Sequence, residues 1–127
     1  MIGFLDNIEK ATLTNKFFRK VLFTGQHQQL VLMTLQPNEE IGEEVHEIVD
    51  QFFRIESGEG KIIIDNEEHV IKDGDAIIVP AQTKHNVINT SSKLPLKLYT
   101  VYSPPHHKHG IVHKTKSEAE ADTTDHL

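Results

Sequence analysis

The chain of 127 residues contains no cysteine. Without thiols it can form no disulfide framework, and it offers neither a thiol nucleophile nor a thiolate ligand for a soft metal. It also lacks any apolar run approaching the roughly 18 residues that span a bilayer. Its first residues have neither the basic start nor the long apolar stretch of a signal peptide. These absences favour a cytoplasmic protein with no membrane partner.

Basic residues are in short supply as well. The chain has 13 Lys and Arg against 19 Asp and Glu, which gives a net charge of −6. Because contacts to phosphates need clustered Lys and Arg, no nucleic-acid partner is expected. The acidic residues are spread along the chain, so we interpret the charge as a contribution to solubility. The length fits one domain covering residues 1–127.

What the chain does have is a series of short strand-forming runs separated by turn residues. These runs are 17–23, 29–35, 52–55, 61–64, 69–71, 76–79 and 94–102. No helix-periodic segment interrupts them, so the pattern predicts an all-β fold, most simply a double-stranded β-helix (jelly roll). The barrel core is expected at 17–102, with apolar residues such as Ile55, Ile62, Ile64, Ile78 and Leu98 inside it.

The two ends differ from the core. A short helical turn is expected near 7–11. Two prolines, Pro104 and Pro105, stop the last strand because proline cannot continue a hydrogen-bonded ladder. The tail, 103–127, should then form one short helix, since Thr115 and Glu118 have the spacing of a capping box.

The most informative segment is 74–89, in which a histidine opens a strand directly after a tight turn. Gly74, Pro80, His85 and Asn89 stand at intervals that resemble the second signature motif of the cupin superfamily. Gln82 stands where that family usually has glycine. The resemblance implies a small β-barrel with His85 as a metal ligand inside it.

A first motif of the same family is recognisable upstream in altered form. Asn38, Glu44, His46, Gln51 and Gly58 keep the family's intervals. Three of them depart from its usual residues: Asn38 replaces a glycine, Glu44 a histidine and Gln51 a glutamate. Together the two motifs cover 38–89, about half of the chain, in the order that the family requires.

The resemblance implies a metal site made by Glu44, His46, Gln51 and His85. Alternate residues of a strand share a face, so Glu44 and His46 should project together. The nitrogen and oxygen ligands suit one divalent transition metal, namely Fe, Mn, Ni, Co or Zn. Glu44 would be the catalytic anionic ligand, and Phe53 and Val87 would line the pocket. The alternative is an acidic loop beside an empty barrel.

Three functions stay open on this basis. The first is a non-haem dioxygenase acting on a small organic molecule, and the second is a sugar isomerase or epimerase resembling cupin phosphomannose isomerases. The third is a non-catalytic metal- or ligand-binding module. Arg54 has the opposite parity to Gln51, and Lys61 and Lys84 lie near turns. No cation is therefore expected inside, which disfavours a phosphorylated substrate and places the dioxygenase first.

Two further expectations concern the tail and the assembly. His106, His107, His109 and His113 form a second histidine cluster. The simpler interpretation is a flexible loop with exposed imidazoles. The other is a second metal site, or a lid that brings a ligand to the barrel mouth. The resemblance to small one-domain cupins also implies a homodimer.

Overall fold

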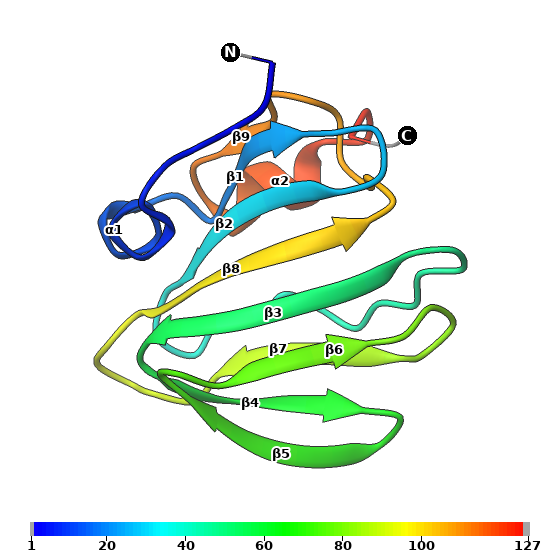
Figure 1. Ribbon diagram of the computed structural model, residues 1–127. Helices are drawn as coiled ribbons and strands as arrows, with labels where there is room; N and C mark the ends of the chain where they lie inside the picture. The colour runs from blue at the N-terminus through cyan, green and yellow to red at the C-terminus, as the bar shows by residue number, and fades with distance from the viewer. Residues whose placement is uncertain (1, 126–127) are drawn as a thin grey trace.

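Nine strands form two antiparallel sheets in the computed structural model, which describes residues 2–125 (Figure 1). The elements in chain order are α1 (Ile8–Thr14), β1 (Arg19–Thr24), β2 (Gln29–Leu35), β3 (Asp50–Ser57), β4 (Glu59–Ile64), β5 (Glu67–Lys72), β6 (Ala76–Val79), β7 (His85–Asn89), β8 (Leu96–Ser103), β9 (Val112–His113) and α2 (Lys116–Ala121). The larger sheet has the order β6-β3-β8-β2-β1-β9, and the smaller has the order β5-β4-β7. The all-β double-stranded β-helix predicted from the sequence is confirmed.

The core lies between the two sheets and is built from alternate residues of each strand. In β8 the residues Leu96, Leu98, Thr100 and Tyr102 are buried, and the residues between them are only partly so. The apolar part of this interior includes Ile55 and Ile62, both at most 1% exposed. This period of two follows from the pleat of a β-strand, which directs successive side chains to opposite faces.

One predicted core residue is wrong. Ile78 is 68% exposed, because β6 pairs with β3 so that Val79, opposite Gln51, faces inward instead. The run Ala-Ile-Ile-Val has no polar residue to mark its outer face, so the sequence alone does not fix which isoleucine is buried. Ile64 is half-buried and packs against the core from its edge.

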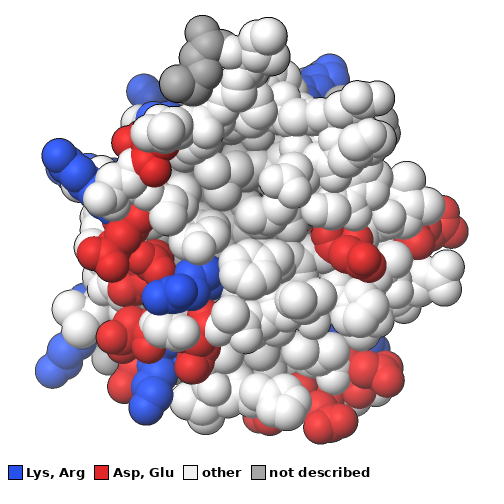
Figure 2. Space-filling view, in the orientation of Figure 1, with Lys and Arg blue, Asp and Glu red and all other residues white. Residues whose placement is uncertain are grey.

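The outer face of the larger sheet carries an apolar row. Ile78 of β6 lies opposite Phe52 of β3, Phe52 lies opposite Val101 of β8, and Val101 lies opposite Leu30 of β2. Figure 2 shows a broad uncharged area at the centre of the face it presents, with acidic and basic side chains interleaved at its left side. The predicted homodimer is not tested by these observations and stays a prediction.

The tail of the chain returns to the barrel. β9 pairs with β1, and α2 lies behind β1 and β2 in the view of Figure 1. The predicted capping box is confirmed, because the Thr115 hydroxyl accepts from the Glu118 N–H while the Glu118 carboxylate accepts from the Thr115 N–H. No helix in residues 2–125 is long and apolar enough to cross a membrane.

The close approach of β4 to β7 gives the first testable prediction. Gly60 of β4 is buried, and a Cβ there would lie 2.4 Å from the carbonyl oxygen of Ile88. Gly60→Ala therefore forces the two strands apart, and we expect it to lower the free energy of unfolding by about 1–3 kcal/mol. Urea denaturation checks this, with Gly3→Ala as the control, because a Cβ at Gly3 meets nothing within 4 Å. Equal stability of the two variants would contradict the packing described here.

Candidate metal centre

The segment that precedes β3 crosses the barrel beside β7. The N–H of Glu44 donates to the carbonyl of His85 at 2.9 Å, and the N–H of His85 donates back at 3.0 Å. Further along, the N–H of Ile41 donates to the carbonyl of Val87 at 2.9 Å. Backbone pairing thus sets Glu44 of the first motif directly opposite His85 of the second.

The turn before β7 accounts for one departure from the motif. Gln82, at the usual glycine position, has a φ of 69°, in the left-handed region that glycine enters without steric penalty. Its N–H donates to the carbonyl of His46 at 2.6 Å. The turn therefore keeps its shape with glutamine in place, and it holds the backbone of His46.

Glu44, His46 and His106 bring three potential ligand atoms to within 4.8 Å of one another. Nε2 of His46 lies 3.9 Å from Oε2 of Glu44, and the rings of His46 and His106 have centroids 4.4 Å apart. His46 is buried, and its Nε2 has no hydrogen-bond partner. A buried nitrogen without a partner is costly unless a ligand satisfies it. The group therefore fits a metal cation.

Gln51 and His85 meet beside this group through the amide oxygen of Gln51 and a ring nitrogen of His85. The Gln51 amide N–H donates to Oγ1 of Thr100, whose own hydroxyl donates to the carbonyl of Phe52, so Oε1 of Gln51 is left as an acceptor. It lies 3.2 Å from Nε2 of His85, while Nδ1 of His85 lies 3.0 Å from the carbonyl of Thr83.

A neutral imidazole donates through only one of its nitrogens. If Nδ1–H of His85 donates to Thr83, then Nε2 presents a lone pair toward the Gln51 oxygen. A cation placed beside both atoms would relieve this repulsion. The hydrogen bond from Nδ1 to a backbone carbonyl is also the kind of contact that orients metal-binding histidines.

The position of His106 is set by a residue of β2. Gln29 is fully buried, and its Oε1 accepts from the N–H groups of His106 at 3.1 Å and His107 at 2.9 Å. Its amide nitrogen donates to the carbonyl of His107 at 2.7 Å and to Oγ1 of Thr24 at 3.0 Å. This clamp fixes the backbone on both sides of His107 and so holds His106 at the barrel mouth.

Tyr102 and His107 form a buried polar wall behind the cluster. The Tyr102 ring stacks on His106 with centroids 5.4 Å apart, and its hydroxyl lies 3.2 Å from Nε2 of His107. Nδ1 of His107 lies 2.6 Å from Oδ2 of Asp125. These contacts therefore link Asp125 to the cluster through His107 and Tyr102.

Burial disfavours the charged forms of three rings in this region, those of Tyr102, His107 and His46. It raises the pKa of Tyr102 well above its ordinary value, with the charge of Glu44 adding to the effect. Burial also lowers the pKa of His107 to about 3, helped by the nearby charge of Arg19. The pKa of His46 is lowered by burial first, with Glu44 opposing the shift and His85 adding to it. A neutral imidazole is the form that binds a metal.

The structure brings the four predicted ligands into one region but divides them. Glu44 and His46 belong to the three-residue group, whereas Gln51 and His85 form the pair beside it. The rings of His46 and His85 have centroids 5.3 Å apart. Whether Gln51 and His85 coordinate stays a prediction. The predicted lining residues Phe53 and Val87 are each 1% exposed, and the Phe53 ring centroid lies 6.1 Å from that of His85.

Sequence reasoning missed His106 as a member of the main site. The interpretation of the tail histidines as exposed is wrong for His107 and His113, which are buried, and for His106, which contacts His46 and Tyr102. It holds only for His109, whose side chain is exposed. The crowding of four histidines after the last strand was a usable signal, but nothing local showed which one turns inward.

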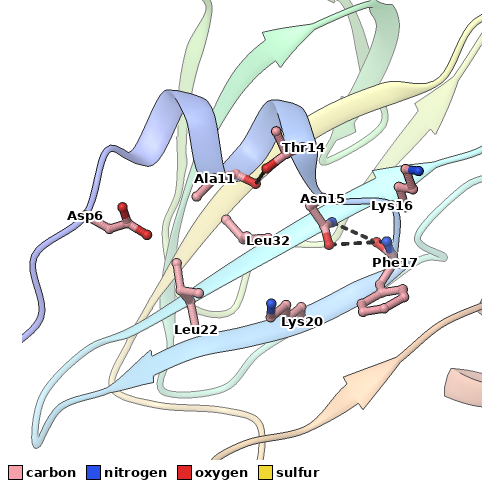
Figure 3. Close-up of a pocket in the computed structure, with 9 residues that line it drawn as sticks. All are labelled: Asp6, Ala11, Thr14, Asn15, Lys16, Phe17, Lys20, Leu22 and Leu32. Atoms are coloured by element: carbon pink, nitrogen blue, oxygen red, sulfur yellow. Dashed lines mark hydrogen bonds between the residues drawn. The ribbon is translucent and has the colours of Figure 1, made fainter.

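A separate cavity lies on the outer side of the larger sheet. A cavity of about 350 Å³ opens between α1 and the outer face of β1 and β2 (Figure 3). Its rim is ordered by Asn15, whose side chain donates to the carbonyl of Phe17 and accepts from the Phe17 N–H. Asp6 and Lys20 also line it. Its lining within residues 2–125 includes no histidine, and it is separate from the metal cluster.

Comparison with known proteins agrees with this geometry. A family model of the cupin domain matches residues 31–102, which is more than half of the chain. The protein therefore belongs to the cupin family. The matched range contains Glu44, His46, Gln51 and His85, but it ends before His106.

Its relatives reproduce the fold closely. The crystal structure of BH2720 from Bacillus halodurans has 46% identity and a TM-score of 0.90, and the match covers 94% of each chain. TT1209 from Thermus thermophilus has 25% identity and a TM-score of 0.69, with 79% of this chain and 96% of that chain covered. Uncharacterized protein YrkC of Bacillus subtilis is 48% identical over 124 residues, 93% of this chain. The chain spans 66% of the length of YrkC.

The second prediction tests the assignment of His106. We expect His106→Ala to weaken Co(II) binding more than 100-fold, because loss of an outer-shell partner alone typically costs about 10–100-fold. Isothermal titration of protein without a histidine tag measures the affinity. His109→Ala is the matched control, since it removes an exposed imidazole three residues away. Equal losses in both variants, or none in His106→Ala, would show that His106 is not a ligand.

Proposed function

We propose that this protein binds one divalent transition metal and acts as a non-haem metal-dependent dioxygenase on a small organic molecule. The observation that carries the proposal is the group of Glu44, His46 and His106, which offers two imidazoles and one carboxylate. Such a set with open positions is typical of non-haem iron oxygenases. It matches the predicted chemistry with His106 in the place expected for His85.

The donor atoms restrict the metal. The described site offers only nitrogen and oxygen ligands, and the chain has no cysteine. Fe, Mn, Ni, Co and Zn all accept such ligands. When bound, the metal supplies a Lewis acid with open positions for the substrate and dioxygen. Gln51 and His85 stand close enough to add ligands or to orient a bound water.

The remaining residues shape the surroundings of the reaction. Phe53 and Val87 give an apolar wall, which excludes water and suits the hydrocarbon part of a substrate. The Tyr102 hydroxyl stays protonated because burial raises its pKa, and it lies 3.2 Å from Nε2 of His107, which can accept its proton and so hold the Tyr102 ring beside the cluster. Glu44 supplies the anionic charge that stabilises a more oxidised metal. Its side chain is 28% exposed, so a small molecule can reach it.

The isomerase and the binding module remain the alternatives. An isomerase would use the same metal to polarise a carbonyl and a nearby base to move a proton. A binding module would keep the metal without turnover. Because dioxygenases consume oxygen and isomerases do not, one experiment separates all three.

The third prediction is that Fe(II)-loaded protein consumes dissolved oxygen with small phenolic, enol or diketone compounds, which chelate a metal through adjacent oxygens. An oxygen electrode records uptake for Fe(II)- and Zn(II)-loaded protein over this panel and over free and phosphorylated aldoses. We expect His46→Ala to lose at least 100-fold of the rate and His109→Ala to keep it. Conversion of an aldose to a ketose without oxygen uptake would establish the isomerase. Tight metal retention without any turnover would establish the binding module.

A further inference from the structure

Arg19 points into the barrel, contrary to the expectation that no cation would. It opens β1 and shares the inward face of that strand with Val21, which belongs to the core. Only 8% of Arg19 is exposed. Lys20, the next residue, is only half-buried and lines the outer cavity beneath α1. The guanidinium is thus separated from Lys20, the other basic residue of β1, and lies in the interior.

The tail holds one end of this guanidinium in place. A nitrogen of Arg19, Nη1, lies 3.3 Å from Nδ1 of His113, and Nε2 of His113 lies 2.9 Å from Oδ2 of Asp122. The carboxylate can only accept, so His113 donates through Nε2 and accepts from Arg19 through Nδ1. Hydrogen bonding to His113 lowers the pKa of Asp122, so this chain of contacts persists with Asp122 charged. Arg19 is therefore oriented, but its positive charge is not neutralised by a direct ion pair.

One nitrogen of the guanidinium lacks an acceptor among residues 2–125. Nε of Arg19 is buried without a hydrogen-bond partner. Within residues 2–125, none of the ion pairs closer than 4.0 Å includes Arg19. The buried carboxylate whose charge acts on it, Asp125, is engaged by Nδ1 of His107 at 2.6 Å and by the N–H of Lys108 at 2.9 Å. Cζ of Arg19 lies 5.2 Å from the centroid of the Phe18 ring, a cation–π contact that supplies no hydrogen-bond acceptor, and an Arg fork matches carboxylates.

A cavity of about 140 Å³ lies beside this group. Its lining residues are Phe18, Arg19, Ile41, Lys116, Ala119 and Glu120. They come from β1, from the segment that leads to Glu44, and from α2. Since one water occupies about 30 Å³ in the liquid, the space suits a molecule with a few carbons rather than an ion alone. Phe18 and Ile41 give it an apolar side, with Lys116 and Glu120 on the helix that covers it.

Tyr102 lies close both to the charge of Arg19 and to the metal group. The charge of Arg19 acts on both Tyr102 and His107, so it lies near them. The Tyr102 ring in turn contacts His106 and His46, with centroids 5.4 and 5.9 Å away. An anion bound to Arg19 would therefore lie in the same part of the interior as the metal ligands.

We propose that Arg19 binds the carboxylate of a small organic acid in this cavity, and that such an acid is the substrate of the metal centre. The assignment of this acid as the substrate rests on the proposed function, whereas the anion site rests on Arg19 alone. A neutral amide analogue would offer one accepting oxygen in place of two and no negative charge to balance the guanidinium. The site should therefore discriminate strongly against it.

The chain itself provides the probe for the first test. It contains two arginines, Arg19 and Arg54, so an ¹⁵N spectrum of arginine Nε–H groups has two signals. Arg54 lies on an outward-facing position of β3, where its Nε is 3.1 Å from Oε1 of Glu56, and it serves as an internal control. Metal-free, untagged protein is titrated with propanoate, with neutral propanamide and with inorganic phosphate. This measurement uses the unmodified protein, so no substitution is needed.

We expect propanoate to shift the Arg19 signal saturably and to leave the Arg54 signal unchanged. Propanamide should bind at least 100-fold more weakly. No shift with propanoate, equal shifts of both arginines, or equal binding of propanamide would overturn the anion site. Tighter binding of phosphate than of propanoate would overturn the assignment to a carboxylate.

The second test asks whether the acid lies near the metal. In Mn(II)-loaded protein we expect the metal to accelerate proton relaxation of bound propanoate. The effect should fall at least tenfold in Arg19→Gln, persist in Arg54→Gln, and leave Mn(II) affinity unchanged in both variants. Anion binding without this relaxation in Mn(II)-loaded protein would overturn the substrate assignment. Failure of Mn(II) to bind would instead overturn the proposed function, and the metal-free titration would still decide the anion site.

Discussion

The barrel mouth depends on the four hydrogen bonds of the Gln29 side chain. This amide is fully buried in β2, and three of its bonds go to the backbone of residues 106 and 107. Without that segment, its oxygen and one of its donors would be left without partners, at a cost of about 1–3 kcal/mol for each unsatisfied group. The tail after β8 is therefore part of the folded interior. It brings His106 to the cluster, pins Tyr102 through His107, and reaches Arg19 through His113.

The interior of the barrel is apolar at one end and polar at the other. Inward residues of β8 change from Leu96 and Leu98 at one end to Thr100 and Tyr102 at the other. The antiparallel partner β3 changes in step, because Ile55 lies opposite Leu98 and Gln51 lies opposite Tyr102. One end is thus an apolar core that stabilises the fold by burial. The other end can collect polar side chains at modest cost, since their hydrogen bonds are made to one another.

The elements that follow local periodicity were predictable from the sequence. The period of two placed Gln51 and Phe53 inward and Arg54 outward, and the motif spacing brought Glu44 opposite His85. These predictions succeed because adjacent residues of a strand carry the information about which face each side chain occupies. The prediction that Ile78 is buried was wrong, and Val79 is buried instead. A short run of apolar residues contains no polar residue to show which side chains face outward.

His106 and Arg19 were beyond such reasoning because long-range contacts place them. His106 stands in a loop without periodicity, and its position depends on Gln29, which lies 77 residues earlier in the chain. Arg19 lies in a run where both faces alternate apolar and basic residues, so its burial depends on which face β9 and α2 cover. The histidine that supports it, His113, is 94 residues away. Motif spacing within one segment therefore cannot show where His106 and Arg19 lie in the fold.

The polar groups left without partners lie where ligands are expected. Of the buried side-chain atoms without a hydrogen bond among residues 2–125, Nε2 of His46 belongs to the metal group and Nε of Arg19 adjoins the cavity behind it. The third, Nε of Arg54, lies 3.1 Å from the carboxylate of Glu56. Native folds satisfy nearly all buried polar atoms, so the unsatisfied ones at His46 and Arg19 indicate partners supplied from outside. A cation at His46 and an anion at Arg19 would supply opposite charges near Tyr102. A metal-binding organic acid offers both kinds of contact in one molecule, through its carboxylate and its remaining oxygens.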